Sequence, residues 1–299
     1  MNRSAVRVGG REVKLSNLEK ELYPSYGFTK AQVLDYYRQI SPFILPHLHG
    51  RALTLKRYPE GVDRPFFFEK RCPPYRPSFV ATARIPLKQG GKMTACLVND
   101  LETLVWVGNL ASLELHVPLA RADSPGLPDA VVFDLDPGEG AGIGDCARVA
   151  LLIRAVLDRL HLKSFPKTSG MKGLHVFVPL NRKGVTFVQA REFSKAVAAM
   201  LQRDHPDLVT TLLAKPERRH RVFINWAQNS STKTMVAVYS LRARASPAVS
   251  FPLEWPEVER AAAGRAKLVI LADEAVRRAG KYGDRFEQVL TVKQALPRL

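Results

Sequence analysis

The sequence predicts a mixed α/β (α+β) fold, and two features support this prediction. Several strand patterns are joined by tight turns, as in residues 81–100, where Gly90 and Gly91 form the turn of a hairpin. Amphipathic helices separate such strands, as in residues 142–160, whose apolar side chains repeat at helical spacing. Because strands joined by a short turn run antiparallel, the pattern excludes a purely parallel sheet.

The remaining elements follow from the same patterns. A helix begins after Thr29, which can cap it, and is expected to end or bend at Pro42. A second helix precedes a strand that ends near His116. Further helices are expected at 186–204 and in the basic tail 256–299, and further strands at 51–71, 130–136, 164–180, 220–230 and 233–242, of which the last two form a pair.

The composition is that of a globular and strongly basic protein. A length of 299 residues is enough to bury a sizeable core, and the sequence has neither a membrane-spanning apolar run nor a secretory signal. The net charge of +17 favours a polyanionic partner such as nucleic acid or nucleotide over a merely solvated basic surface. Three scattered cysteines without a CxxC pair predict neither a zinc site nor a disulfide framework, and indicate a reducing cytoplasm.

Two carboxylates follow an apolar strand in the stretch AVVFDLDPGEG, residues 130–140. Residues two apart on a strand point to one face, so Asp134 and Asp136 project together. Like charges this close repel unless a cation lies between them, and hard divalent cations prefer oxygen ligands. The pair is therefore a candidate metal site, and the alternative is a solvated strand end that caps the next turn.

A short turn bracketed by glycines follows in KTSGMKGLH, residues 167–175. Ser169 and Lys172 supply a hydroxyl and an ammonium group, and the backbone N–H groups of such a turn can form an anion nest. The stretch lacks the Walker spacing, so the alternative is a plain hairpin turn with an exposed lysine.

Basic and aromatic residues alternate in residues 56–71, a pattern typical of nucleic-acid binding by phosphate contacts and base stacking. Of Phe66, Phe67 and Phe68, at least one is expected in the core and one exposed. Arginines flank the two later strands and can hold phosphates bidentately, namely Arg218, Arg219, Arg221, Arg242 and Arg244.

Taken in order, these stretches resemble a known family, the polymerase domain of bacterial end-joining DNA ligase D in the archaeo-eukaryotic primase superfamily. The resemblance is carried by LSNLEKELYP (15–24), GRALTLKRYPEGVDRPFFFEK (50–70), LELHVP (113–118), VVFDLDPGEG (131–140), KTSGMKGLHVFVPL (167–180), VFINWAQNS (222–230) and YSLRAR (239–244). It implies a primase-polymerase catalytic fold, with antiparallel and mixed sheets flanked by helices.

The resemblance also implies a single domain over 1–299, with an N-terminal helical part at about 1–45, a catalytic core at about 46–250 and a helical tail at about 251–299. Its activity is nucleotide addition to primer 3′ ends at gaps and breaks, with a ribonucleotide preference and Mn²⁺ or Mg²⁺. The implied partners are gapped or broken DNA with a 5′-phosphate, NTP or dNTP, and the ligase, phosphoesterase and Ku proteins of end joining. No ligase or phosphoesterase pattern follows Leu299, so we expect a stand-alone homologue or an excised domain, cytoplasmic and nucleoid-associated.

Site residues carry over by position. Asp134 and Asp136 match the first two metal ligands, which in a two-metal mechanism hold the triphosphate and the attacking 3′-oxygen. The positions that match the nucleotide pocket are Lys56, His116, Ser169, Lys172, Arg242 and Phe68. The positions that match DNA contacts are Lys20 and Lys30 for the 5′-phosphate, Phe67 and Phe68 near the template, Arg84 and Lys88 in the hairpin, and Arg218 near the primer end.

One departure from the family pattern concerns the third carboxylate. The family places an acid in the strand pattern VFxDW, where this sequence has Asn225. An amide oxygen offers no charge to a cation, so we expect nucleotide and DNA binding with sharply reduced extension. The alternatives are a non-catalytic module that binds and bridges DNA ends, a stand-alone primase and a metal-dependent nuclease.

Overall fold

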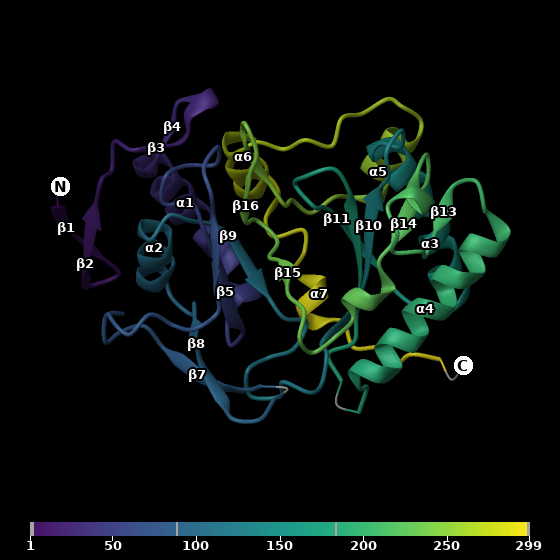
Figure 1. Ribbon diagram of the computed structural model, residues 1–299, viewed down its shortest axis with the longest axis horizontal. Helices are drawn as coiled ribbons and strands as arrows, with labels where there is room; N and C mark the ends of the chain where they lie inside the picture. The colour runs from purple at the N-terminus through teal and green to yellow at the C-terminus, as the bar shows by residue number, and fades with distance from the viewer. Residues whose placement is uncertain (1–2, 88, 183, 298–299) are drawn as a thin grey trace. The chain divides into compact units, whose positions relative to one another are not determined.

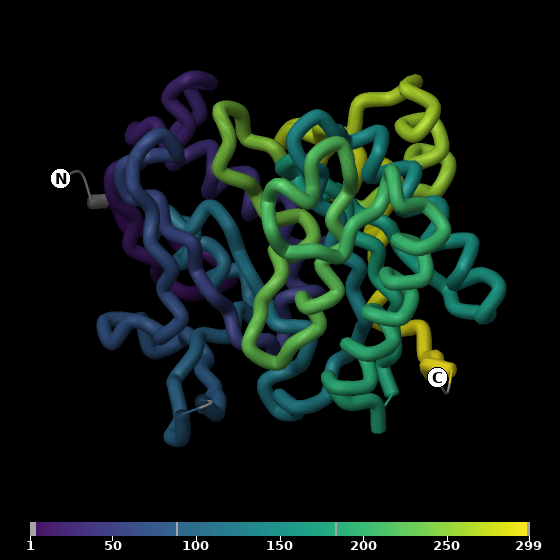
Figure 2. Tube along the Cα trace, turned by 45° about the vertical axis from the view of Figure 1, so that its right-hand side comes forward, coloured from purple at the N-terminus to yellow at the C-terminus, as the bar shows by residue number. Residues whose placement is uncertain are grey.

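The computed structural model describes residues 3–87, 89–182 and 184–297, and the chain forms two compact units. Each unit is built from three separate stretches of the chain, which can be followed in Figure 2 by colour from purple near the N-terminus to yellow near the C-terminus. Unit 1 comprises Met1–Pro125, Thr234–Ser250 and Ile270–Asp284, and unit 2 comprises Gly126–Lys233, Phe251–Val269 and Arg285–Leu299.

Unit 1 is built on a six-stranded antiparallel sheet in the order β15-β9-β5-β8-β7, with β6 paired to β5 outside this path (Figure 1). Three separate hairpin-like pairs, β1-β2, β3-β4 and β16-β17, complete its strands. The strands are β1 Arg3–Val8, β2 Arg11–Ser16, β3 Glu21–Tyr23, β4 Phe28–Thr29, β5 Ala52–Arg57, β6 Phe67–Glu69, β7 Thr82–Pro86, β8 Lys92–Leu97, β9 Ser112–Val117, β15 Met235–Val236, β16 Leu241–Ala243 and β17 Pro247–Val249. The helices are α1 Lys30–Leu48, α2 Leu101–Asn109 and α6 Ala272–Tyr282.

The first helix begins where the sequence predicts and ends later. The Thr29 side chain accepts from the Gln32 backbone in a full capping box, which confirms the predicted start. The expected end at Pro42 is wrong, because α1 continues to Leu48. Proline removes the N–H that would bond the Arg38 carbonyl, but the Ser41 hydroxyl donates to that oxygen at 2.8 Å and satisfies it.

Unit 2 is built on a five-stranded mixed sheet in the order β11-β12-β10-β14-β13, in which only β13 and β14 run parallel. Its strands are β10 Ala130–Pro137, β11 Phe165–Thr168, β12 Leu174–Pro179, β13 Val209–Thr210 and β14 Val222–Ile224. Its helices are α3 Ile143–Arg159, α4 Phe187–Asp204, α5 Trp255–Ala262 and α7 Gln288–Thr291. The two sheets confirm the predicted mixed α/β fold with antiparallel and mixed sheets and flanking helices.

The central strand β10 separates a core face from an open face. Val131, Phe133 and Leu135 are fully buried and pack with apolar side chains of α3 and α4 in one cluster. Successive strand residues alternate between faces, so Asp134 and Asp136 lie on the face away from those two helices. The predicted strand therefore buries its odd-numbered residues and leaves its carboxylates outside the core.

Two predictions about pairing are wrong. The strands at 220–230 and 233–242 do not pair, because β14 joins β10 in unit 2 while β15 joins β9 in unit 1. Cys72 and Cys96 form a disulfide across 24 residues, because the Cys72 N–H donates to the Thr94 carbonyl and brings the Cys72 and Cys96 Cα atoms to 4.8 Å. Cys146 is free and buried.

The other predicted elements are confirmed. The hairpin β7-β8 turns at Gly90 and Gly91, which both adopt the positive φ expected of a tight turn. The helices α3 and α4 and the pair β11-β12 lie in the predicted ranges. Within the described ranges, no helix has the length and apolar character that a membrane crossing requires.

Phe133→Ala should lower the free energy of unfolding by about 3–5 kcal/mol, because it empties the volume between β10 and α4. Phe133 is 0% exposed and its ring lies 6.5 Å from that of Phe193. Denaturation by urea measures the change. Val188→Ala, at a side chain that is 70% exposed, is the matched control and should change stability by less than about 0.5 kcal/mol. Equal losses in the two variants would contradict the proposed core.

Candidate functional site

The two aspartates of β10 lie side by side on the open face of the unit 2 sheet. Asp134 is opposite His175 of β12, and Asp136 is opposite Phe223 of β14. The Asp134 side chain is 14% exposed, while Asp136 is exposed. Directly opposed residues of antiparallel strands share a face, so a histidine and an aromatic ring flank the carboxylates.

Asn225 follows β14 and contacts Asp134 twice. Its backbone N–H donates to the Asp134 carbonyl oxygen at 2.9 Å, and its side-chain Nδ2 donates to Asp134 Oδ2 at 3.1 Å. The ionised carboxylate only accepts hydrogen bonds, so the amide nitrogen must face it and Asn225 Oδ1 turns away. That oxygen is buried and accepts no hydrogen bond from any residue that the structure describes.

His175 contacts the other oxygen of the same carboxylate. Its Nε2 lies 3.3 Å from Asp134 Oδ1. Both oxygens of Asp134 thus have a nitrogen neighbour, the imidazole on one side and the amide of Asn225 on the other. The sequence marked His175 only as a lone histidine, and the signal that places it here is the β10-β12 register, which a sequence does not display.

The turn that carries Lys172 is held against β10. A Cβ atom at Gly173 would lie 1.9 Å from the Leu135 carbonyl oxygen, so only glycine allows this close approach. Lys172 is exposed beside it. The turn is therefore fixed next to the backbone between Asp134 and Asp136.

At this turn Ser169 engages two of the backbone amides that an anion nest could use. The Ser169 hydroxyl oxygen accepts from the backbone N–H groups of Met171 and Gly173, both at 3.1 Å. Its own O–H hydrogen still serves as a donor for a phosphate oxygen. The hydroxyl of Ser169 and the ammonium of Lys172 are thus the side-chain groups that this turn can offer to an anion.

The segment with Arg218 is held against the residue that follows the C-terminal end of β10. The Gly138 N–H donates to the Arg221 carbonyl at 2.9 Å, and a Cβ at Gly138 would lie 1.8 Å from the Arg218 carbonyl oxygen. The Arg218 guanidinium lies 3.7 Å from the centroid of the Phe223 ring, and Phe223 is the residue opposite Asp136. Stacking on this ring places a cation on the same face as the carboxylates.

In unit 1, a row of side chains crosses three strands. Phe68 of β6 pairs with Lys56 of β5, and Lys56 pairs with Glu114 of β9. His116 is two residues further along β9, on the same face as Glu114. The predicted nucleotide residues Phe68, Lys56 and His116 therefore lie on one face of one sheet.

Glu114 was not predicted from the sequence, and it is the centre of this row. Its side chain is 1% exposed and contacts Lys56 Nζ at 3.1 Å, His116 Nε2 at 2.9 Å and Arg242 Nε at 3.4 Å. Burial opposes the charged form, but the His116 hydrogen bond and the charges of Arg242 and Lys56 outweigh it and hold the pKa of Glu114 well below its usual range. Burial lowers the pKa of His116, so that its imidazole is neutral at pH 7.

The aromatic cluster of β6 is exposed throughout. Phe66, Phe67 and Phe68 are 48%, 44% and 55% exposed, so the expectation that at least one belongs to the core is wrong. The reason is that β6 pairs only with β5, which leaves the rings uncovered. The Lys56 ammonium lies 4.2 Å from the Phe66 ring centroid, and the Arg57 guanidinium lies 5.1 Å from that of Phe67. Exposed rings beside cations suit base stacking.

Lys20 and Lys30 lie together in unit 1. The Lys30 backbone N–H donates to the Lys20 carbonyl at 2.8 Å. Lys30 is only 5% exposed and its Nζ donates to the Ser16 carbonyl at 2.6 Å, while Lys20 Nζ lies 2.7 Å from Glu60. Burial, and then the charges of Lys20 and Arg57, lower the pKa of Lys30 to about 8. Of the hairpin residues, Arg84 is exposed on β7, and Lys88 lies outside the described residues.

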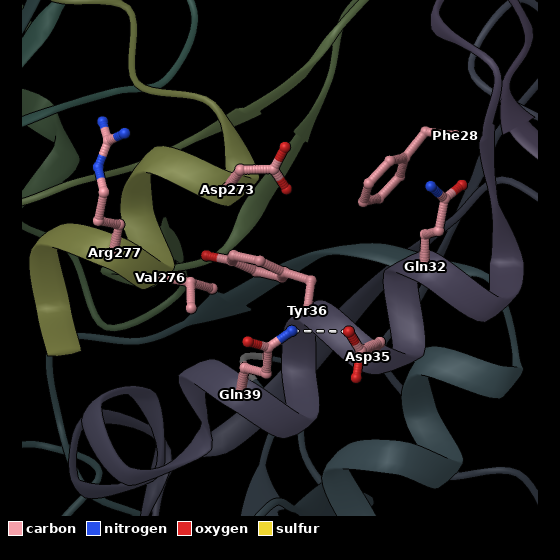
Figure 3. Close-up of a pocket in the computed structure, with 8 residues that line it drawn as sticks. All are labelled: Phe28, Gln32, Asp35, Tyr36, Gln39, Asp273, Val276 and Arg277. Carbon is pink, nitrogen blue, oxygen red and sulfur yellow. Dashed lines mark hydrogen bonds between the residues drawn. The ribbon is translucent and has the colours of Figure 1, made fainter.

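A pocket of about 310 Å³ lies apart from these residues, between α1 and α6 in unit 1 (Figure 3). Its wall includes Tyr36, Asp273 and a hydrogen bond of 2.6 Å from Gln39 to Asp35. None of the predicted site residues lines it. This pocket is thus separate from the residues that the motifs indicate.

A comparison with known protein families shows to which family this chain belongs. The primase-polymerase domain of LigD matches residues 29–286, a span that contains Asp134, Asp136 and Asn225. The chain belongs to the LigD primase-polymerase family.

Two curated relatives show the extent of this LigD-type domain. The multifunctional non-homologous end joining protein LigD of Mycolicibacterium smegmatis is 40% identical over 274 residues, which are 91% of this chain and 35% of the relative. The bifunctional non-homologous end joining protein LigD of Bacillus subtilis is 30% identical over 248 residues, which are 83% of this chain and 40% of the relative. The chain thus spans well under half the length of these relatives.

A solved structure shows the same architecture. The polymerase domain of Mycobacterium tuberculosis ligase D, in complex with DNA, has a TM-score of 0.87 and 38% sequence identity to this primase-polymerase domain. The likeness covers 94% of this chain and 99% of that one. Fold and family therefore agree with the resemblance carried by the sequence motifs.

The carboxylates of this LigD-type domain do not form a complete acidic cluster. Over the ranges that the structure describes, no three or more His, Cys, Asp or Glu side chains are arranged to hold a metal ion. The oxygen donors that remain near β10 are Asp134, Asp136 and the amide of Asn225. The amide of Asn225 takes the position next to Asp134, at its Oδ2.

Gly173→Ala should destabilise the domain by about 1–3 kcal/mol and weaken binding of ATP, because the added methyl group pushes the Lys172 turn away from β10. Thermal unfolding and ATP titration measure the two effects. Gly126→Ala is the matched control, since a Cβ there meets no atom within 4 Å. If a stably folded Gly173→Ala variant binds ATP with unchanged affinity, the Lys172 turn is not part of the ATP site.

Proposed function

We propose that this chain is a DNA-dependent nucleotidyltransferase, a gap-filling or end-extending polymerase with a ribonucleotide preference in the repair of double-strand breaks by non-homologous end joining. The observation that carries the proposal is the pair Asp134 and Asp136 on the open face of the unit 2 sheet, with the Lys172 turn held against the backbone between them. Family membership and the DNA complex of the related polymerase domain support it.

A divalent ion, Mn²⁺ or Mg²⁺, suits the donors on β10. Asp134 and Asp136 offer carboxylate oxygens on one face, and Asn225 offers its oxygen once its amide group turns over, because Nδ2 now faces Asp134 and the buried Oδ1 lacks a hydrogen-bond donor among the described residues. When bound, such ions stabilise the charge that develops on a triphosphate and on an attacking 3′-oxygen. Asp134, Asp136 and Asn225 are therefore the residues that we assign to metal binding.

The chain's own cations and rings bind and orient the substrates in this proposal. We assign nucleotide binding to Ser169 and Lys172 of unit 2 and, considered by itself, unit 1 carries the assigned residues Lys56, His116 and Arg242. Phe68 stacks on its base, and Phe67 stacks on the template. All of these side chains are held by the strands described above, so that little ordering remains to be done when the nucleotide binds.

The DNA contacts that we propose are electrostatic. Lys20 and Lys30 hold the 5′-phosphate on the far side of a gap, and Arg84 and Arg218 contact the DNA backbone and the primer end. Lys88 of the same hairpin is assigned with Arg84. The partners in the cell are the ligase, phosphoesterase and Ku activities of end joining, in a cytoplasmic and nucleoid-associated setting. We also keep the proposal that 1–299 acts as one catalytic domain.

Asn225 is proposed to reduce extension strongly. Its side-chain Nδ2 donates a hydrogen bond to Asp134 Oδ2 and therefore competes with a cation for that oxygen. Its oxygen carries no formal charge, so it cannot neutralise the charge of a cation as a carboxylate does. A metal that binds with the triphosphate still has two carboxylates, whereas the ion near the primer 3′-oxygen is weakened.

Asn225→Asp should raise primer extension on a gapped, 5′-phosphorylated substrate with Mn²⁺ by at least about ten-fold, which is about 1.4 kcal/mol in the barrier. The added charge restores the third carboxylate, so Mn²⁺ affinity, measured by electron paramagnetic resonance, should rise too. Asn99→Asp is the matched control, because its carboxylate can still accept from the Gly50 N–H. Strong primer extension by the unsubstituted chain would contradict the proposal that Asn225 reduces extension.

The same comparison tests the alternative of a non-catalytic module that binds and bridges DNA ends. Asn225 is the observation that favours this alternative, since it removes one catalytic charge from an otherwise complete set. Extension by neither chain would establish the module and exclude both the polymerase and a stand-alone primase. Degradation of the primer without nucleotides would instead indicate a nuclease.

The preference for a 5′-phosphate should fall as pH rises from 7 to 9. Lys30 has a pKa lowered to about 8, so it carries its positive charge below pH 8 and loses it above. The phosphate itself is already charged at pH 7, because its second pKa is about 6. Affinities for gapped DNA with and without the 5′-phosphate, compared by fluorescence anisotropy, give the preference.

Two variants control this titration. Lys30→Arg keeps its charge throughout and should hold the preference constant with pH. Lys20→Ala should abolish much of the preference at every pH, because Lys20 is the more accessible of the two ammonium groups. A preference that persists in Lys20→Ala and does not change with pH would place the phosphate site elsewhere.

A further inference from the structure

One buried carboxylate in unit 1 has no role in the function proposed above. Glu114 is 1% exposed, and both of its oxygens are in contact with donors. Oε1 lies 3.1 Å from Lys56 Nζ, accepts from the Tyr58 hydroxyl at 3.0 Å and from the Ala243 N–H at 3.3 Å. Oε2 lies 2.9 Å from His116 Nε2 and 3.4 Å from Arg242 Nε.

We propose that Glu114 is a positioning residue of the nucleotide site, which holds Lys56, His116 and Arg242 in the arrangement that receives a nucleoside triphosphate. The inference rests on the proposed function, because it takes these three side chains as the nucleotide contacts of unit 1. Glu114 itself does not touch the substrate.

Lys56 and Arg242 keep N–H donors that Glu114 does not engage and that remain for a ligand. An ammonium group has three N–H donors and a guanidinium group has five, and Glu114 engages one atom of each. No described residue hydrogen-bonds the two terminal nitrogens of Arg242. The side chains of Lys56 and Arg242 are 16% and 14% exposed, so each is largely immobilised before a ligand arrives.

The carboxylate also determines the orientation of His116. An ionised Glu114 accepts only, so a neutral His116 must carry its proton on Nε2 and turn Nδ1 away from Glu114. The ring edge of His116 also packs against Phe68, at a centroid distance of 6.2 Å. Glu114 thus selects the tautomer of His116 and, through the Lys56–Phe68 row, the position of the stacking ring.

Burial of an ionised carboxylate costs desolvation free energy unless the charge is paired, as Glu114 is with the groups around it. Without Glu114, the cations Lys56 and Arg242 would repel each other and separate into solvent. Charge alone suggests the opposite effect on ligand binding, because removal of a carboxylate makes the pocket more positive and more attractive to a triphosphate. This opposition makes positioning and simple charge distinguishable by experiment.

The test compares ATP binding by the full chain and by Glu114→Gln, measured by isothermal titration calorimetry with Mg²⁺. Positioning predicts at least about ten-fold weaker ATP binding, although the variant gains a unit of positive charge. Glu114→Asp keeps the charge and withdraws it by one methylene group, and it too should bind ATP more weakly. Unchanged or tighter ATP binding by Glu114→Gln would overturn the inference.

A second readout separates positioning from damage to the fold of unit 1. Affinity for gapped DNA with a 5′-phosphate, which depends on Lys20 and Lys30 in the same unit, should change less than two-fold. Glu102→Gln is the matched control, since Glu102 is also buried, at 7% exposure, and lies outside the Glu114 contacts. Loss of ATP and DNA binding together would show a structural role only, and would also overturn the inference.

A milder variant covers the case in which Glu114→Gln does not fold. Tyr58→Phe removes one hydroxyl group from Glu114 Oε1 and changes no charge. It should weaken ATP binding by about three-fold through looser placement of the carboxylate, and unchanged affinity would count against positioning. Failure of the unchanged chain to bind ATP at all would be a failure of the proposed function, and that result is distinct from each of these.

Discussion

The alternation of side chains along β10 is the constraint on which the unit 2 site depends. Val131, Phe133 and Leu135 are driven into the core with α3 and α4, and burial of large apolar side chains contributes about 1.5–3 kcal/mol each. Once these residues face the helices, the geometry of a strand sends Asp134 and Asp136 to the opposite face. The carboxylates are thus placed by the hydrophobic effect acting on their neighbours. A slip of one residue would bury both charges, which makes the register strongly preferred.

Close backbone contacts bring the other site segments of unit 2 to this strand. Gly138 admits the Arg218 carbonyl and Gly173 admits the Leu135 carbonyl at distances that any side chain would prevent. The Lys172 turn and the Arg218 segment are therefore both held near the C-terminal end of β10 by the absence of side chains at Gly173 and Gly138. Asn225 joins them through its backbone hydrogen bond to Asp134.

Unit 1 uses electrostatic interactions for the same purpose. Glu114 is held ionised in a buried position by Lys56, His116 and Arg242, and these groups are in turn held by the carboxylate. Hydrogen bonds to charged groups are stronger in a low-dielectric setting and leave little freedom to the partners. The uncovered strand β6 and the preceding Phe66 add three exposed rings beside this cluster. Cationic donors and aromatic faces therefore occur together on one sheet.

Local patterns in the sequence were enough for the helices α3 and α4, the Thr29 cap, the hairpin β7-β8 and the acidic strand, because spacing and turn residues determine these features within a short window. The order of the motifs along the chain was enough to predict the family. Tertiary structure decided what joins distant segments: the pairing of β14 with β10 and of β15 with β9, the Cys72–Cys96 disulfide, the approach of His175 to Asp134 and the contacts of Glu114. Such contacts depend on which strands become neighbours in a sheet, and that choice arises from burial over the whole chain, which no local spacing records.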